Sequence, residues 1–108
     1  MVYMSPTAGT ASAPLPAKVR RASEEIGGDF AAWRKILGLT AEQVAERAGI
    51  SRGTLRRLEH GDSSVGFHVV LRVARGLGVL DTLTEALDPL NTDLGRARAA
   101  LIDKKRVR

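Results

Sequence analysis

The chain has 108 residues and no cysteine, which excludes disulfide bonds and thiolate metal sites. Its formal net charge is +5, which favours an anionic partner such as nucleic acid, an acidic protein or a membrane surface. No apolar run approaches the roughly 18 residues that can span a bilayer, and the start of the chain lacks the basic and apolar regions of a signal peptide. We therefore expect one small cytoplasmic domain with tails and no membrane partner.

The first part of the chain combines a segment that lacks core-forming residues with a first helix. Residues 1–17 are rich in Ser, Thr, Ala, Gly and Pro. They hold too little apolar bulk to offset the entropy of ordering, so we predict that they are disordered. Residues 18–26 can begin a helix, which the pair Gly27-Gly28 is expected to interrupt or end. The first firm helix is predicted from Asp29, as its cap, to Leu37, because its apolar residues repeat at helical spacing.

Two short helical patterns follow, with only three residues between them. Thr40 opens the first helix, and Gln43 completes a Thr-x-x-Gln capping box. Gly49 is suited to a left-handed conformation at the end of this helix. Ser51 caps the second helix, which we expect over residues 52–60 with its two leucines facing the core.

The remaining elements also have a helical pattern. Helices are predicted over residues 67–76 and 80–87, and a short one over residues 93–102. No strand pattern occurs among them. We therefore predict an all-α protein with a compact five-helix domain over residues 18–88. A flexible segment would precede this domain, and a flexible basic tail over residues 89–108 would follow it.

No residue pattern in the chain supports catalysis. The two histidines, His60 and His68, are eight residues apart in a chain without cysteine and are a poor metal-binding pair. A surface imidazole at a helix end is the simpler interpretation of each. The glycines form no phosphate-binding loop, and carboxylates such as Glu24 and Glu25 lie on helix faces that we predict to be exposed. We expect neither an enzyme nor a bound metal or cofactor.

The two short helices have the pattern of a helix-turn-helix. Gly49 permits a tight corner between them, and the apolar Ile50 can fill it. The second helix starts at Ser51 with its unpaired N–H groups outward, where they attract phosphate. Three arginines lie on its outer faces, and arginine is the side chain best matched to guanine O6 and N7 in a major groove. These residues favour DNA binding, and the alternative is an ordinary helical hairpin with a solvated basic face.

A resemblance to a known family strengthens the DNA-binding interpretation. The run from Leu39 to Ser51, followed by Thr54-Leu55 and by Leu58-Glu59-His60-Gly61, resembles the phage repressor/Cro type of regulator, the XRE family. The resemblance covers about residues 28–87. It implies a bundle of about five helices that binds double-stranded operator DNA as a homodimer.

The resemblance also implies roles for particular residues. Arg34 and Glu59 would form an ion pair that ties two helices together, and Thr40 would contact phosphate. Gln43 would either contact the DNA backbone or serve only its helix cap. The remaining residues of the predicted DNA-binding surface are Ser51, Arg52, Gly53, Thr54, Arg56, Arg57 and His60. Among them, Arg52 and Arg57 are our first choices for base contacts.

Two positions depart from the family pattern. Gly53 offers no side chain where relatives often place a base-reading residue, and we interpret it as a point of close approach. Asp62 stands where some members have a basic phosphate contact. Arg96, Arg98 or the basic end of the chain would then compensate.

The C-terminal part has a second and narrower resemblance. Leu87-Asp-Pro-Leu, Asp93-Leu-Gly-Arg and the basic end resemble small regulators that accompany HipA-type kinase toxins. The implied function is an autoregulatory antitoxin that represses its own operator in the nucleoid and sequesters such a toxin. The alternatives are a stand-alone XRE-type repressor without a toxin partner and a protein-interaction adaptor that does not bind DNA.

Overall fold

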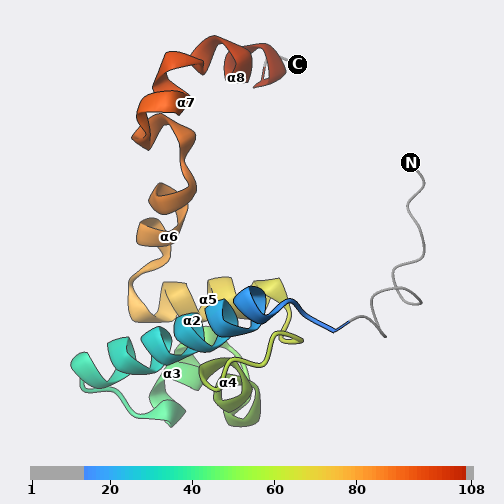
Figure 1. Ribbon diagram of the computed structural model, residues 1–108. Coiled ribbons are helices and arrows are strands. Elements are labelled where there is room, and N and C mark those ends of the chain that lie inside the picture. Colours follow the sequence, from blue (N-terminus) through green and yellow to red (C-terminus); the bar gives the residue numbers. More distant parts are fainter. Residues whose placement is uncertain (1–13, 107–108) are drawn as a thin grey trace.

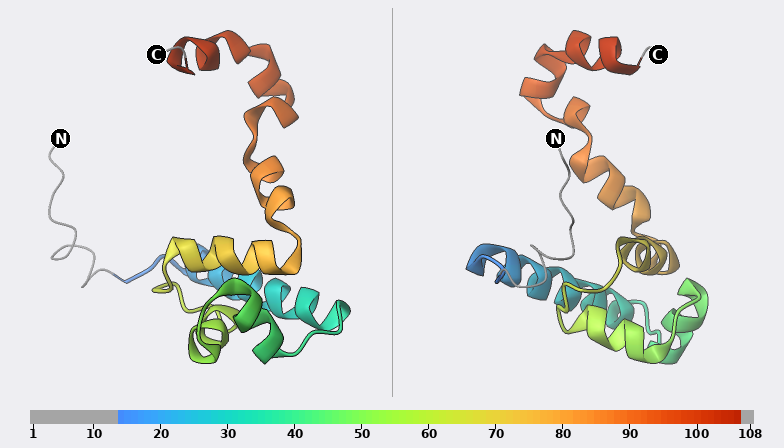
Figure 2. Two further views of the ribbon diagram at one scale, coloured as in Figure 1. Left: turned by 180° about the vertical axis from the view of Figure 1, so that it is seen from behind. Right: turned by 90° about the vertical axis from the view of Figure 1, so that its right-hand side faces the viewer.

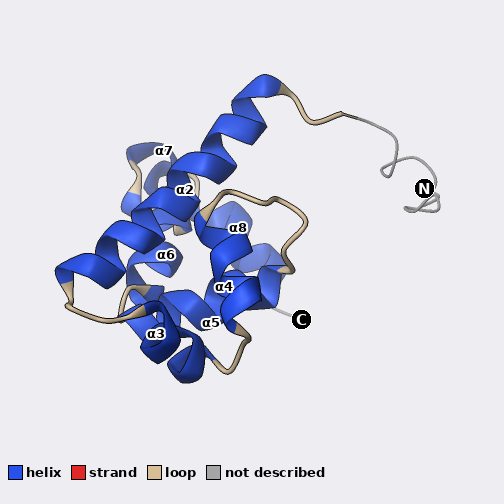
Figure 3. Cartoon of the chain, turned by 90° about the horizontal axis from the view of Figure 1, so that it is seen from below, coloured by secondary structure: helices blue, strands red, loops and turns tan. Residues whose placement is uncertain are grey.

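The structure, a computed structural model, describes residues 14–106 and the side chains of residues 14–102 (Figure 1). This part of the chain is all-α, with helices joined by loops and no strand (Figure 3). The helices are α2 (Ala17–Ile36), α3 (Ala41–Ala48), α4 (Arg52–Glu59), α5 (Phe67–Leu77), α6 (Leu80–Leu87), α7 (Asp93–Ala97) and α8 (Ala99–Arg106), with a 3-10 turn, η1 (Pro89–Asn91), after α6. The predicted disorder of residues 1–17 falls mainly on residues 1–13, which lie outside the described part.

Helices α2 to α5 enclose one hydrophobic core. Its largest fully buried side chains are Val44 of α3, Leu55 of α4 and Val73 of α5, and α2 contributes Phe30. Full burial of one such side chain stabilises the fold by about 1.5–3 kcal/mol. The predicted inward face of α4, with its two leucines, is therefore the face that packs.

The sequence-based expectation for α2 is wrong, because the helix continues through Gly27 and Gly28 without a break. Asp29 consequently lies inside the helix and does not cap it. Gly27 is buried against the end of α4, where an added Cβ would overlap the carbonyl oxygen of Leu58. A glycine in a helix interior costs about 1 kcal/mol relative to alanine, and here it permits the two helices to approach closely.

Beyond the core, the chain forms a projecting arm of α6, η1, α7 and α8 (Figures 1 and 2). Leu80 and Leu83 of α6 still pack against the core, but α6 has no buried residue and Leu87 is 84% exposed. The radius of gyration is 17.0 Å, compared with about 13 Å for a compact domain of 100 residues. The expected compact five-helix domain is thus a four-helix core with α6 at its edge.

The end of the arm contains two short helices where one was predicted over residues 93–102. Thr92 caps α7 by accepting a hydrogen bond from the Gly95 amide at 2.9 Å, and Arg98 separates α7 from α8. Helix α8 runs to Arg106, so the expected basic tail is helical over most of its length. Between residues 14 and 106, no helix has both the length and the apolar character needed to cross a bilayer.

Candidate nucleic-acid interface

The site is built on the corner between α3 and α4, and α3 begins with the predicted capping box. Thr40 Oγ1 accepts a hydrogen bond from the Gln43 amide at 3.0 Å, and Gln43 Oε1 accepts one from the Thr40 amide at 2.9 Å. The side-chain oxygen of Gln43 therefore serves the helix start. Both residues are exposed.

The corner itself depends on Gly49, whose φ of 70° is the left-handed conformation that glycine adopts most readily. The next amide, of Ile50, donates to the carbonyl of Ala45 at 3.0 Å, and the Ile50 side chain packs against the core. Arg72 of α5 supports the corner because its Nη1 donates to the Ala48 carbonyl at 3.3 Å. Sequence reasoning missed Arg72, since nothing in the local pattern places its side chain against a helix end 24 residues earlier.

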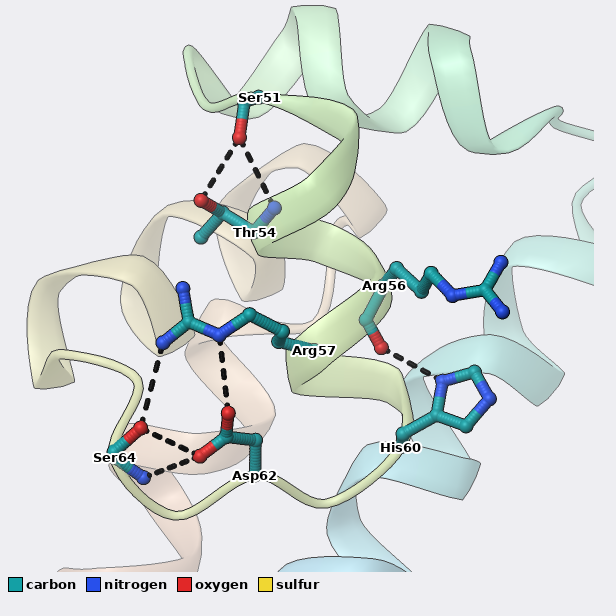
Figure 4. Close-up of polar contacts among 7 residues, drawn as sticks. All are labelled: Ser51, Thr54, Arg56, Arg57, His60, Asp62 and Ser64. Carbon is teal, nitrogen blue, oxygen red and sulfur yellow. Dashed lines mark hydrogen bonds and ion pairs between the residues drawn. The ribbon is translucent and has the colours of Figure 1, made fainter.

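Helix α4 starts with a cap at Ser51, as predicted. Ser51 Oγ accepts from the Thr54 amide at 3.0 Å and donates to Thr54 Oγ1 at 2.9 Å (Figure 4). The amides of Arg52 and Gly53 belong to the first turn, whose donors have no partner within a helix. Gly53 is exposed, and a Cβ there would meet only Ser51 Oγ, at 3.9 Å. The fold of this chain therefore does not itself require glycine at position 53.

The arginines of α4 are all exposed and lie on two sides of the helix. Arg56 and Arg57 point in opposite directions (Figure 4). Arg52, Arg56 and His60 line a shallow cleft of about 380 Å³, which also reaches Arg34 of α2. His60 Nδ1 lies 2.8 Å from the carbonyl oxygen of Arg56. The structure thus divides the predicted surface into a cleft side with Arg52, Gly53, Arg56 and His60 and an outer side with Ser51, Thr54 and Arg57.

Arg34 and Glu59, the two residues that the family resemblance pairs, form a bidentate ion pair between α2 and α4. Arg34 Nε lies 2.8 Å from Glu59 Oε2, and Nη2 lies 3.0 Å from Oε1. The side chains are only 17% and 11% exposed. The hydrogen bond to Glu59 raises the pKa of Arg34. Because Arg34 compensates its charge, Glu59 adds little repulsion toward an anion at α4.

Arg57 on the outer side is held by two residues of the loop that follows α4. Its Nε donates to Asp62 Oδ2 at 3.0 Å, and its Nη2 donates to Ser64 Oγ at 3.4 Å. Asp62 Oδ1 accepts from the Ser64 amide at 2.9 Å and from the Ser64 hydroxyl at 2.6 Å. These Ser64 hydrogen bonds, followed by that of Arg57, lower the pKa of Asp62 to about 2.

Sequence reasoning identified Asp62 as unusual but missed Ser64. The signal was available, because an aspartate followed two residues later by a serine is typical of a turn in which the aspartate side chain accepts from the backbone. Among the described side chains, Arg52 and Arg56 make no ion pair, so they carry most of the uncompensated positive charge of α4. The same part of the chain holds no cluster of three potential metal ligands.

The comparisons with known proteins agree with this geometry. Residues 20–87 match a family described as a helix-turn-helix domain, and because the match covers more than half of the chain, this protein belongs to that family. A relative from Methanothermobacter thermautotrophicus, named an uncharacterized HTH-type transcriptional regulator, is 49% identical over 45 residues. That match covers 42% of this chain and 65% of the relative, so it spans just under two thirds of the relative's length. No solved structure matches the chain.

Proposed function

We propose that this protein is a DNA-binding transcriptional regulator that reads its operator with α4. The observation that carries the proposal is the exposure of Arg52, Arg56 and Arg57 on a helix presented by a glycine corner. A helix of this kind fits a major groove, and helix-turn-helix proteins use the second helix of the motif for this purpose.

The residues of this surface are proposed to divide the contacts between base edges and the DNA backbone. Arg52, near the start of the helix, and Arg57, on the outer side, are proposed to contact base edges. Thr40 starts α3 and Ser51 starts α4 at the corner, and helix starts favour phosphate oxygens. Arg56 and His60, at the cleft, are proposed to contact the DNA backbone. Gln43 would contribute its amide nitrogen, since its oxygen is used in the cap.

We further propose that the protein represses transcription as a homodimer. Helices α3 and α4 lie at the end of the core opposite the arm (Figures 1 and 2), so a second copy can bind at the arm without covering α4. The arm exposes Leu87 and Leu94, which are 84% and 64% exposed. Two α4 helices in successive major grooves would require half-sites about 34 Å apart. Such a dimer would occlude a promoter in the nucleoid, most simply its own.

The antitoxin function is a narrower prediction that rests on the resemblance of residues 87–108 to regulators that accompany HipA-type kinases. A kinase-like reading frame next to this one, whose product co-purifies with the protein, would support it. If no such neighbour exists, the protein is a stand-alone repressor. Light scattering at micromolar concentration tests the homodimer independently of either outcome.

Selection of bound duplexes from a random pool tests the central proposal. We expect a defined, two-fold symmetric site whose affinity falls steeply with salt, because each neutralised phosphate contributes about −0.9 to the slope of log K against log salt. A pool that never enriches, with weak binding that is indifferent to sequence, would instead indicate a protein-interaction adaptor.

A further inference from the structure

The loop after α4 places a carboxylate directly beside a proposed base-reading arginine. The Asp62 amide donates to the Arg57 carbonyl at 3.0 Å, so the backbone fixes the start of the loop against the end of α4. Gly61, with φ of 83°, turns the chain there. The Asp62 carboxylate then returns to the Arg57 side chain through Nε. Ser64 holds the other carboxylate oxygen with two hydrogen bonds.

This arrangement restricts the orientation of the Arg57 guanidinium. Two of its nitrogens, Nε and Nη2, are engaged by Asp62 and Ser64, while Nη1 makes no hydrogen bond within residues 14–102 and points toward Thr54 (Figure 4). The side chain is 51% exposed, so it remains accessible to a ligand. An arginine held in this way offers its remaining N–H donors, chiefly the two on Nη1, in a restricted direction and cannot swing freely to the nearest phosphate.

The charge of Asp62 also bears on binding. Its pKa is about 2, so the carboxylate is ionised at neutral pH and compensates the charge of Arg57. A fixed negative charge near a duplex repels phosphates, and a compensated arginine adds little to sequence-independent attraction. Both effects weaken binding to arbitrary DNA more than binding to a site whose base accepts from Nη1.

We propose that Asp62 is a specificity-determining residue that, with the support of Ser64, positions Arg57 for base contact and suppresses its contact with phosphate. The inference rests on the proposed function, because it assigns a role to the loop only if α4 binds DNA. Some members of the resembling family have a basic phosphate contact at this position. We interpret the aspartate in this chain as a residue that reduces non-specific affinity for DNA.

The test compares wild-type protein with Asp62→Asn on two duplexes of equal length. One duplex is selected by the wild-type protein from a random pool, and the other is its scrambled sequence. Asp62→Asn keeps the shape of the loop and removes the charge. We expect its affinity for the scrambled duplex to rise about two- to fivefold, the range that exposed charge pairs produce. Its salt slope on that duplex should steepen by about 1, and the ratio of specific to non-specific affinity should fall.

Asp81→Asn is the matched control, because it removes an equal charge from the exposed start of α6. Ser64→Ala should give an intermediate loss of specificity. The Arg57 Nε–H signal in NMR spectra should be protected from exchange in wild-type protein and lose that protection in Asp62→Asn, and thermal unfolding should show that each variant folds.

The outcomes separate the two proposals. If the wild-type protein binds the selected duplex and Asp62→Asn matches Asp81→Asn in both the specificity ratio and the salt slope, the role of Asp62 is overturned while the proposed function stands. A variant that loses stability but keeps the wild-type ratio would likewise assign Asp62 to a merely structural turn. If the wild-type protein selects no duplex, both proposals are overturned.

Discussion

Helix α4 takes part in two arginine–carboxylate ion pairs in different surroundings: an inner pair toward α2 and an outer pair toward the loop that follows α4. Toward α2, Arg34 and Glu59 are mostly buried and join two helices of the core. On the outer side, Arg57 and Asp62 are 51% and 37% exposed and join a helix only to the loop that follows it. Exposed pairs contribute little to stability, whereas breaking a buried pair leaves an uncompensated charge. The inner pair therefore stabilises the fold, whereas the outer pair contributes little to stability and can serve the recognition that we propose.

The largest expected effect on stability comes from adding a side-chain atom at the close contact between α2 and the end of α4. Gly27→Ala places a Cβ against the backbone of Leu58 and Glu59, which cannot move as a flexible side chain can. We expect a loss of about 3 kcal/mol in the free energy of unfolding, measured by urea denaturation.

Gly28→Ala is the matched control for this prediction, because no atom lies within 4 Å of the added Cβ. It should stabilise the helix by about 0.5–1 kcal/mol. Equal effects of the two substitutions would show that α2 and α4 do not approach as described.

Substitutions on the outer side of α4 should change DNA binding rather than stability. Arg57→Ala is expected to weaken binding to the selected duplex by about 1–3 kcal/mol and to relax the base preference at one position of each half-site. Arg75→Ala, an exposed arginine of α5, provides the control. Unchanged affinity and unchanged base preference for Arg57→Ala would remove Arg57 from the reading surface.

Breaking the pair between Arg34 and Glu59 should instead change stability rather than DNA binding. Glu59→Gln leaves the Arg34 guanidinium without a charged partner in a mostly buried position, and we expect it to lower the free energy of unfolding by about 1.5 kcal/mol. The affinity of the folded fraction for DNA should change little. Glu46→Gln, on the exposed face of α3, is the control, and comparable losses of stability in both variants would contradict the structural role of the pair.

The smallest expected effect is the acid dependence of the outer pair. The pKa of Asp62 falls from 3.8 to about 2 on folding, so its stabilisation is fully present above pH 3.8 and is lost as pH falls toward 2. As pH falls through this window, the thermal unfolding midpoint of the wild-type protein should therefore decrease more steeply than that of Asp62→Asn. Parallel curves would show that the folded and unfolded states hold the Asp62 proton equally.

The local features of the site could be predicted from the sequence because each depends on neighbouring residues. The Thr40 cap with Gln43, the left-handed Gly49 and the Ser51 cap all follow from the chemistry of short segments. Whether Gly27 ends α2 or lies inside it could not be predicted in this way. A glycine in a helical pattern ends a helix or permits close packing according to what lies opposite, and the partner here is 31 residues away.

The arm and the contacts of Arg57 with Asp62 and Ser64 could likewise not be predicted from local sequence alone. Leucines at residues 87, 90 and 94 have a core-like spacing, yet all three are exposed. Their burial would require a surface that the single chain does not provide between residues 14 and 106. Ser64 contacts both Asp62 and the Arg57 side chain, and its contact with Arg57 became visible once the loop geometry placed the three residues together.

An NMR titration of the isotope-labelled full chain with the selected duplex tests most directly whether α4 is the surface presented to DNA. We expect the largest amide shifts at residues 51–57, smaller ones at Thr40 and the loop at Asp62, and little change in the parts of α2 and α5 that face away from the corner. Shifts concentrated on the arm, with the amide signals of α4 unchanged, would show that α4 is not the surface that contacts DNA.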